Sequence, residues 1–201
     1  MAENEIQEKI DSLTEQDIDY GVAVVLACEG EDAAEIEALI ATYDFYGCSA
    51  ICATAIPGTP VHNVALARAM AIRDTFDGSL CLFPILVAGS TSQDIVFGDA
   101  RAQAEDLQDK IDLMDETELG SAFERIIYDD AQAYSINFEE KIKILDHTDW
   151  ETPLGDEAFG EAEAYAQTLA DLSKLAIRTL PGSAQQKKIL EKMKRAVAMC
   201  P

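Results

Sequence analysis

Residues 20–28 read YGVAVVLAC, residues 48–56 read CSAICATAI and residues 79–89 read SLCLFPILVAG, and these three stretches decide the predicted fold. Each is almost continuously apolar and has the length of a strand. The segments between them carry apolar residues at helical spacing instead. Strands that are apolar on both faces and separated by helices are typical of a parallel sheet covered on both sides. The sequence therefore predicts an α/β fold with a short parallel sheet of three or four strands flanked by helices, the fourth candidate being residues 93–98.

The second half of the chain has apolar residues at helical spacing almost throughout. We expect residues 1–98 to form the α/β half-sheet region and residues 99–201 to form a helical region. The helical region either packs on the sheet as one domain or forms a separate lobe. No internal repeat is predicted.

The predicted sheet locates a candidate site, because open parallel sheets bind ligands beyond the carboxyl ends of their strands. Three loops would meet there, residues 28–32, 54–63 and 89–94. Proton transfer is assigned to His62 and Glu29, whose side chains can act as acid or base. Hydroxyl and amide groups that could hold a phosphate or carboxylate of a small metabolite come from Thr59, Asn63, Ser90, Thr91 and Ser92.

Acidic residues near the same loops would oppose an anion unless a divalent cation lay between them. Asp94, Glu31 and Asp32 are therefore candidate ligands for a cation such as Mg²⁺, which prefers oxygen donors. Each assignment has a structural alternative. Glu31 and Asp32 could complement a helix N-terminus, the Ser-Thr-Ser run could form a turn and a helix cap, and His62 could be a polar residue of a first helical turn.

The charge of the chain is unevenly distributed. Residues 1–173 hold 37 acidic and 8 basic side chains, whereas residues 174–201 hold 7 basic side chains and one acidic, for a net charge of −23. So acidic a surface would repel nucleic acid. The predicted loops suggest one function class, a small-molecule enzyme or ligand-binding protein that acts on an anionic metabolite. The contrast in charge suggests a second, a non-catalytic subunit or accessory protein that assembles through an acidic body and a basic C-terminal helix, as a homo-oligomer or as part of a complex.

Cysteine usage and missing motifs limit the function classes further. Cys48, Cys52 and Cys81 lie in apolar stretches and are predicted to be buried, unreactive thiols. The sequence contains no P-loop, no dinucleotide-binding glycine motif and no nucleophile elbow. An acidic N-terminus without an apolar core, and the lack of a membrane-length apolar run, predict a cytoplasmic protein that does not bind membranes.

Overall fold

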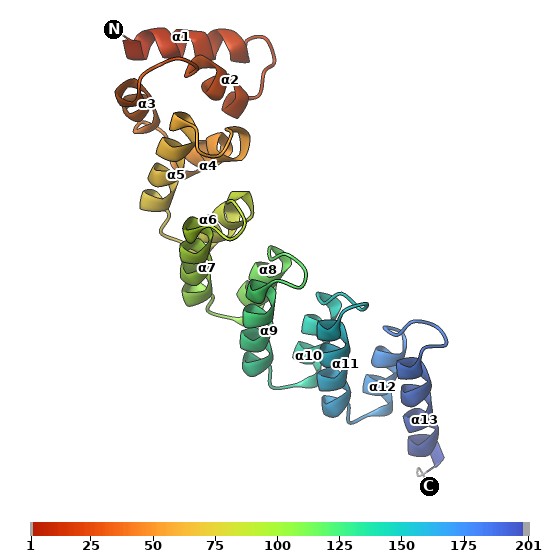
Figure 1. Ribbon diagram of the computed structural model, residues 1–201. Coiled ribbons are helices and arrows are strands. Elements are labelled where there is room, and N and C mark those ends of the chain that lie inside the picture. Colours follow the sequence, from red (N-terminus) through yellow and green to blue (C-terminus); the bar gives the residue numbers. More distant parts are fainter. Residues whose placement is uncertain (1, 199–201) are drawn as a thin grey trace. The chain divides into compact units, whose positions relative to one another are not determined.

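The computed structural model describes residues 2–198, with side chains from residue 5 onward. The chain divides into two compact units, Met1–Gln103 and Ala104–Pro201. The first contains α1 (Ala2–Thr14), α2 (Tyr20–Ala27), α3 (Ala33–Ile40), α4 (Phe45–Thr54), α5 (Pro60–Ile72), α6 (Phe76–Leu82), the 3₁₀ turn η1 (Phe83–Ile85) and α7 (Thr91–Gln103). The second contains α8 (Leu107–Asp115), α9 (Ala122–Tyr134), α10 (Phe138–Asp146), α11 (Pro153–Tyr165), α12 (Leu169–Ala176) and α13 (Ala184–Ala198) (Figure 1).

The predicted parallel sheet is wrong, because residues 2–198 contain helices and connecting turns and no strand. The three apolar stretches form α2, most of α4, and α6 with η1, and residues 93–98 lie in α7. Side chains of Asp19, Asp44 and Thr75 cap the first three of these helices by accepting backbone N–H groups. A short apolar run is compatible with a buried helix as well as a buried strand. Here the capping side chains favour the helix, because they satisfy backbone N–H groups that a first helical turn leaves free.

The expected division after residue 98 falls inside α7, five residues before the end of that helix. None of the helices in residues 2–198 combines the length and the apolarity that crossing a membrane requires. Apolar spacing over residues 162–176 predicts one long helix, but the structure has two, because α11 ends at Tyr165 and Thr168 begins α12 with a capping box.

The helices from α4 onward repeat with a period of 31 residues, so the expectation of no internal repeat is also wrong. The N-caps that open the first helix of each pair are Asp44, Thr75, Asp106, Asn137 and Thr168. Hydroxyl side chains open the second helix of each pair at Thr59, Ser90, Ser121, Thr152 and Ser183. Each repeat is therefore a pair of helices, as in α-helical solenoids.

The same two positions of every repeat supply the core. Each repeat is counted from the N-cap of its first helix as residue 1. The eighth residue of the repeat is fully buried each time, as Ile51, Leu82, Leu113, Ile144 and Leu175. The twenty-second is also fully buried each time, as Ala65, Val96, Ile127, Ala158 and Ile189. One of these positions lies on the first helix of the pair and the other on the second, so the two helices of each repeat bury their apolar faces together.

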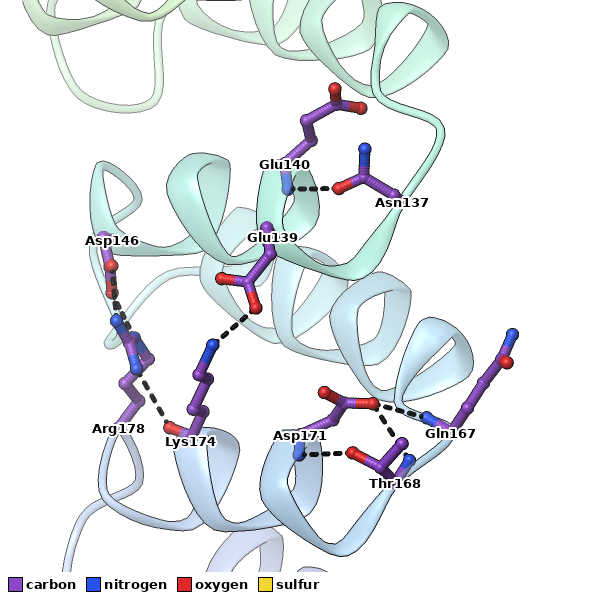
Figure 2. Close-up of polar contacts among 9 residues, drawn as sticks. All are labelled: Asn137, Glu139, Glu140, Asp146, Gln167, Thr168, Asp171, Lys174 and Arg178. Atoms are coloured by element: carbon purple, nitrogen blue, oxygen red, sulfur yellow. Dashed lines mark hydrogen bonds and ion pairs between the residues drawn. The ribbon is translucent and has the colours of Figure 1, made fainter.

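Within the second unit, the pairs α8–α9, α10–α11 and α12–α13 each lie side by side (Figure 1). Polar contacts join equivalent positions of successive repeats: Asp115 Oδ2 lies 2.8 Å from His147 Nδ1, and Asp146 Oδ1 lies 2.6 Å from Arg178 Nε. Figure 2 shows the second of these pairs together with Glu139–Lys174, which also links α10 to α12. The contacts of Asp115 and Asp146 lie one repeat apart.

The basic C-terminal helix packs on its own unit. Ile189 of α13 is fully buried, and α13 lies against α12. The carboxylate of the buried Glu163 in α11 forms ion pairs with two lysines of α13: its Oε2 lies 2.6 Å from Lys188 Nζ, and its Oε1 lies 2.5 Å from Lys192 Nζ. Burial opposes ionisation of Glu163, but the two ammonium groups prevail and lower its pKa. The described part of this helix ends at Ala198, so the expected end at Met199 lies outside the described residues.

Candidate functional site

Two adjoining hollows in the first unit form the candidate site. The first, of about 400 Å³, lies between α2, α3 and the start of α5, and the second, of about 550 Å³, lies between α1 and α2. They share Leu26 and Glu29, so they form one continuous surface. Its walls combine apolar and acidic side chains, among them Leu13, Leu26, Ala27, Ile56, Glu5, Glu8, Glu29 and Glu31. We call these eight residues the acidic hollow surface.

The apolar part of this surface is open to solvent. Leu26 is 47% exposed although it lies in one of the most apolar segments of the chain, and Ile56 is 72% exposed. Leu26 occupies the α2 side of the hollow, and Ile56 lies in the turn between α4 and α5. Exposed apolar side chains beside a hollow are typical of a binding surface.

Carboxylates at the acidic hollow surface give it negative charge. Lys9 Nζ lies 2.6 Å from Glu31 Oε1, and this hydrogen bond is the main reason that the pKa of Glu31 lies below its usual value. Glu31 is therefore ionised at neutral pH. Glu5, Glu8 and Glu29 are exposed acidic residues on the same surface. The surface can accept an apolar group accompanied by cations.

Cys28 lies in the wall of the smaller hollow but is not suited to nucleophilic chemistry. It is buried, and burial, helped by the charge of Glu31, raises the pKa of its thiol to about 11. At neutral pH the protonated thiol predominates strongly, and the thiolate is the reactive form. Cys28 therefore contributes an apolar wall.

The residues predicted for the sheet-end site are only partly brought together. Glu29, Glu31 and Thr59 line the same hollow. Thr59 also caps α5 by accepting the His62 backbone N–H at 3.4 Å, and Asn63 Nδ2 donates to the Gly58 carbonyl at 3.2 Å. His62 is buried and is not among the residues that line this hollow.

The predicted anion cradle has a local structural role. Ser90 Oγ accepts the Gln93 backbone N–H at 3.2 Å and so caps α7, as the turn-and-cap alternative predicted. Thr91 is the first residue of α7, and Ser92 and Asp94 lie in its first turn. None of these four residues lines the acidic hollow surface. Their role in holding an anionic ligand stays a prediction.

The proposed Mg²⁺ ligands do not form a cluster. Asp32 caps α3 by accepting the backbone N–H groups of Ala34 and Glu35, both at 3.0 Å, and Glu31 is engaged by Lys9. Across the part of the chain with described side chains, no group of three or more His, Cys, Asp or Glu residues is placed to hold a metal ion. For Asp32 the helix N-terminal alternative is confirmed.

Sequence reasoning missed the apolar half of the surface. Leu26 was assigned to the interior of a strand, and Ile56 to the end of another. An indication was available in Asp19, an N-cap residue directly before the apolar run Tyr20–Cys28. A helix that begins at Asp19 directs its side chains to all sides. Because nearly all of them are apolar here, some apolar side chains must face solvent.

No family model matches the chain, and no curated protein or solved structure matches it at a significant level.

Thiol labelling tests the local burial around this site. Cys28, Cys48 and Cys52 are buried, and burial raises the pKa of all three, to about 12 for Cys52. Cys81 is exposed, which corrects the prediction that it is buried. We expect iodoacetamide at pH 8 to label Cys81 at least about tenfold faster than the other three, because they expose little thiol and less thiolate.

Peptide mapping by mass spectrometry assigns each label to its cysteine. Raising the pH toward 11 should speed labelling of Cys28 relative to Cys52, since the pKa of Cys28 is the lower of the two. Labelling of all four at similar rates in the native protein would contradict the burial of the first three. Unfolding in urea provides the control, where all four should react alike.

Proposed function

We propose that this chain is a non-catalytic assembly protein that binds a basic, amphipathic segment of a partner at the acidic hollow surface. The observation that carries the proposal is the combination of exposed Leu26 and Ile56 with Glu5, Glu8, Glu29 and Glu31 around two adjoining hollows. An apolar face of the partner would enter the hollows, and its lysine or arginine residues would meet the carboxylates.

The repeat architecture supports a binding role. Tandem helix pairs are stabilised by contacts between neighbours and commonly present extended binding surfaces. Here the repeated polar residues cap helices or pair with neighbouring repeats, as Thr59, Ser90 and Asp146 do.

A fluorescein-labelled synthetic helix-forming peptide of lysine and leucine, with leucine at positions i, i+3 and i+7, is a suitable probe. We expect it to bind the full chain at 150 mM salt, as measured by fluorescence anisotropy. The double variant Leu26→Lys with Glu29→Lys should weaken binding at least about tenfold, because it removes an apolar contact and reverses a charge. Both residues are exposed, so folding should be preserved.

The matched control is Leu119→Lys with Glu118→Lys. It makes the same chemical changes at two exposed residues of the second unit, outside the acidic hollow surface. It should change peptide affinity less than about twofold, as expected for diffuse electrostatic attraction. Equal weakening by the two double variants would mean that net charge alone attracts the peptide, and the proposed site would be rejected.

A further inference from the structure

The last helix that the structure describes carries a second exposed surface that combines apolar and charged side chains. In α13, Lys187, Leu190, Lys194 and Val197 follow one another at spacings of three and four residues and so share one face of the helix. We call these four residues the basic stripe. Leu190 is 42% exposed and Val197 is 59% exposed, and both lysines are exposed.

Comparison with the other repeats shows how far Leu190 and Val197 depart from their equivalents. Leu190 is the twenty-third residue of its repeat; the equivalent Phe97, Tyr128 and Phe159 are buried, and Leu66 is half-buried. Val197 is the thirtieth; the equivalent Ala104 and Ser135 are buried, and Arg73 and Ala166 are half-buried. None of these equivalents is as open to solvent as Leu190 and Val197 are.

The basic stripe has the chemistry that the acidic hollow surface accepts. Residues 174–201 carry seven basic side chains and one acidic, and residues 1–103 carry 17 acidic and four basic. The stripe places Lys187 and Lys194 beside two exposed apolar side chains, and Lys194 Nζ also lies 2.8 Å from Glu191 Oε1 of the same helix. The hollow surface places Glu5, Glu8 and Glu29, together with the Lys9-paired Glu31, beside Leu13, Leu26, Ala27 and Ile56. Opposite charge, with apolar side chains on both surfaces, favours contact between the two.

We propose that the partner at the acidic hollow surface is a second copy of this chain, which contributes the basic stripe of its α13. This inference rests on the proposed function and identifies its partner. The contact joins two different surfaces, so it is head-to-tail, and two joined copies together still offer one free stripe and one free hollow surface. Such an association grows beyond a dimer unless its geometry closes a ring.

Sedimentation velocity tests the proposal with the full chain. We expect the average mass of the wild-type chain to rise above that of the monomer with concentration up to about 0.5 mM, and to fall again in 1 M salt as the charges are screened. Leu190→Glu with Lys194→Glu blocks the stripe, and Leu26→Lys with Glu29→Lys blocks the hollow surface. Each double variant alone should remain monomeric.

An equimolar mixture of the two blocked variants gives the decisive result. One variant keeps its hollow surface and the other keeps its stripe, so the mixture should form a dimer and nothing larger. Ile136→Glu with Lys143→Glu, which makes the same changes at exposed residues of the second unit, should associate like the wild type.

Two results would overturn self-association: a wild-type chain that stays monomeric throughout, or a mixture of blocked variants that stays monomeric. If the lysine–leucine peptide nevertheless binds the hollow surface, the proposed function stands and its partner is another basic, amphipathic protein segment. If the peptide also fails to bind, both proposals are rejected. Loss of association in the Ile136 and Lys143 variant would show that charge, not the stripe, drives it.

Discussion

Replacing Ile127 by alanine should lower the free energy of unfolding of the second unit by about 2–4 kcal/mol. Ile127 lies in α9 at the repeat position that is fully buried in every pair, and its side chain has no exposed surface. Alanine would remove three buried carbon atoms and leave a cavity that the neighbouring helices can fill only in part. The effect is large because Ile127 lies on the buried face by which the two helices of its pair pack together.

Urea unfolding followed by the fluorescence of Trp150 measures this change, since the single tryptophan lies in the second unit and packs against Phe159. The control is Ile136→Ala, which removes the same atoms from a side chain that is 77% exposed and should cost less than about 0.5 kcal/mol. Similar losses for Ile127 and Ile136 would contradict the repeated core.

The helices of residues 99–201, and those between the three apolar stretches of the first half, were predictable from apolar spacing, whereas the helices formed by the three stretches were not. Residues 99–201 show one apolar face per helix, a pattern that strands do not share. The stretches at 20–28, 48–56 and 79–89 are apolar on every side, so their period carries no information. Only the capping residues before them, such as Asp19 and Asp44, distinguish helix from strand.

The repeat was visible in principle through its turns. Glycine precedes a hydroxyl residue at Gly58, Gly89, Gly120 and Gly182, which are 31 or 62 residues apart, and all four have φ between 72° and 89°. Glycine adopts this conformation without steric cost. The core positions obscure the repeat, because they conserve apolar character while the residue changes among alanine, valine and isoleucine.

The candidate site was predictable only in its acidic part. Glu29 and Glu31 were placed at the site because they follow an apolar run, and they do line the hollow with Thr59. Ser90, Thr91, Ser92 and Asp94 belong to a different repeat. A sheet would have placed all three loops along one edge, whereas tandem helix pairs place successive turns on successive repeats.

The fourth repeat departs from the turn pattern, and a second large effect is expected there. In three repeats the second helix has a side chain that accepts the backbone N–H of the turn glycine: Gln93 for Gly89, Glu124 for Gly120 and Gln186 for Gly182. In the fourth repeat the glycine is replaced by Glu151 and the accepting residue by Gly155. Asp149 Oδ1 accepts the Glu151 N–H instead, at 3.0 Å.

In the fourth repeat the turn lies close to α11, and Gly155 permits this close approach because it has no side chain. A Cβ atom at Gly155 would lie 2.2 Å from the backbone oxygen of Asp149 and 2.9 Å from its carbonyl carbon. Neither atom can move without the turn that carries Trp150. We therefore expect Gly155→Ala to lower the free energy of unfolding of the second unit by about 1–3 kcal/mol, as overpacking does, and to shift the emission of Trp150.

Gly160→Ala, in the same helix α11, is the matched control and should have the opposite sign. A Cβ atom there meets nothing within 4 Å, and Gly160 is exposed. Alanine should stabilise the helix by about 0.5–1 kcal/mol, because glycine loses more conformational freedom on folding. Both variants are measured by urea unfolding of the full chain. If Gly155→Ala were as stable as Gly160→Ala, the close approach of Asp149 would be refuted. If Gly155→Ala alone is destabilised, glycine is required at this position because the turn packs directly on α11. The contact between Asp149 and Gly155 then also accounts for Glu151 in place of the turn glycine.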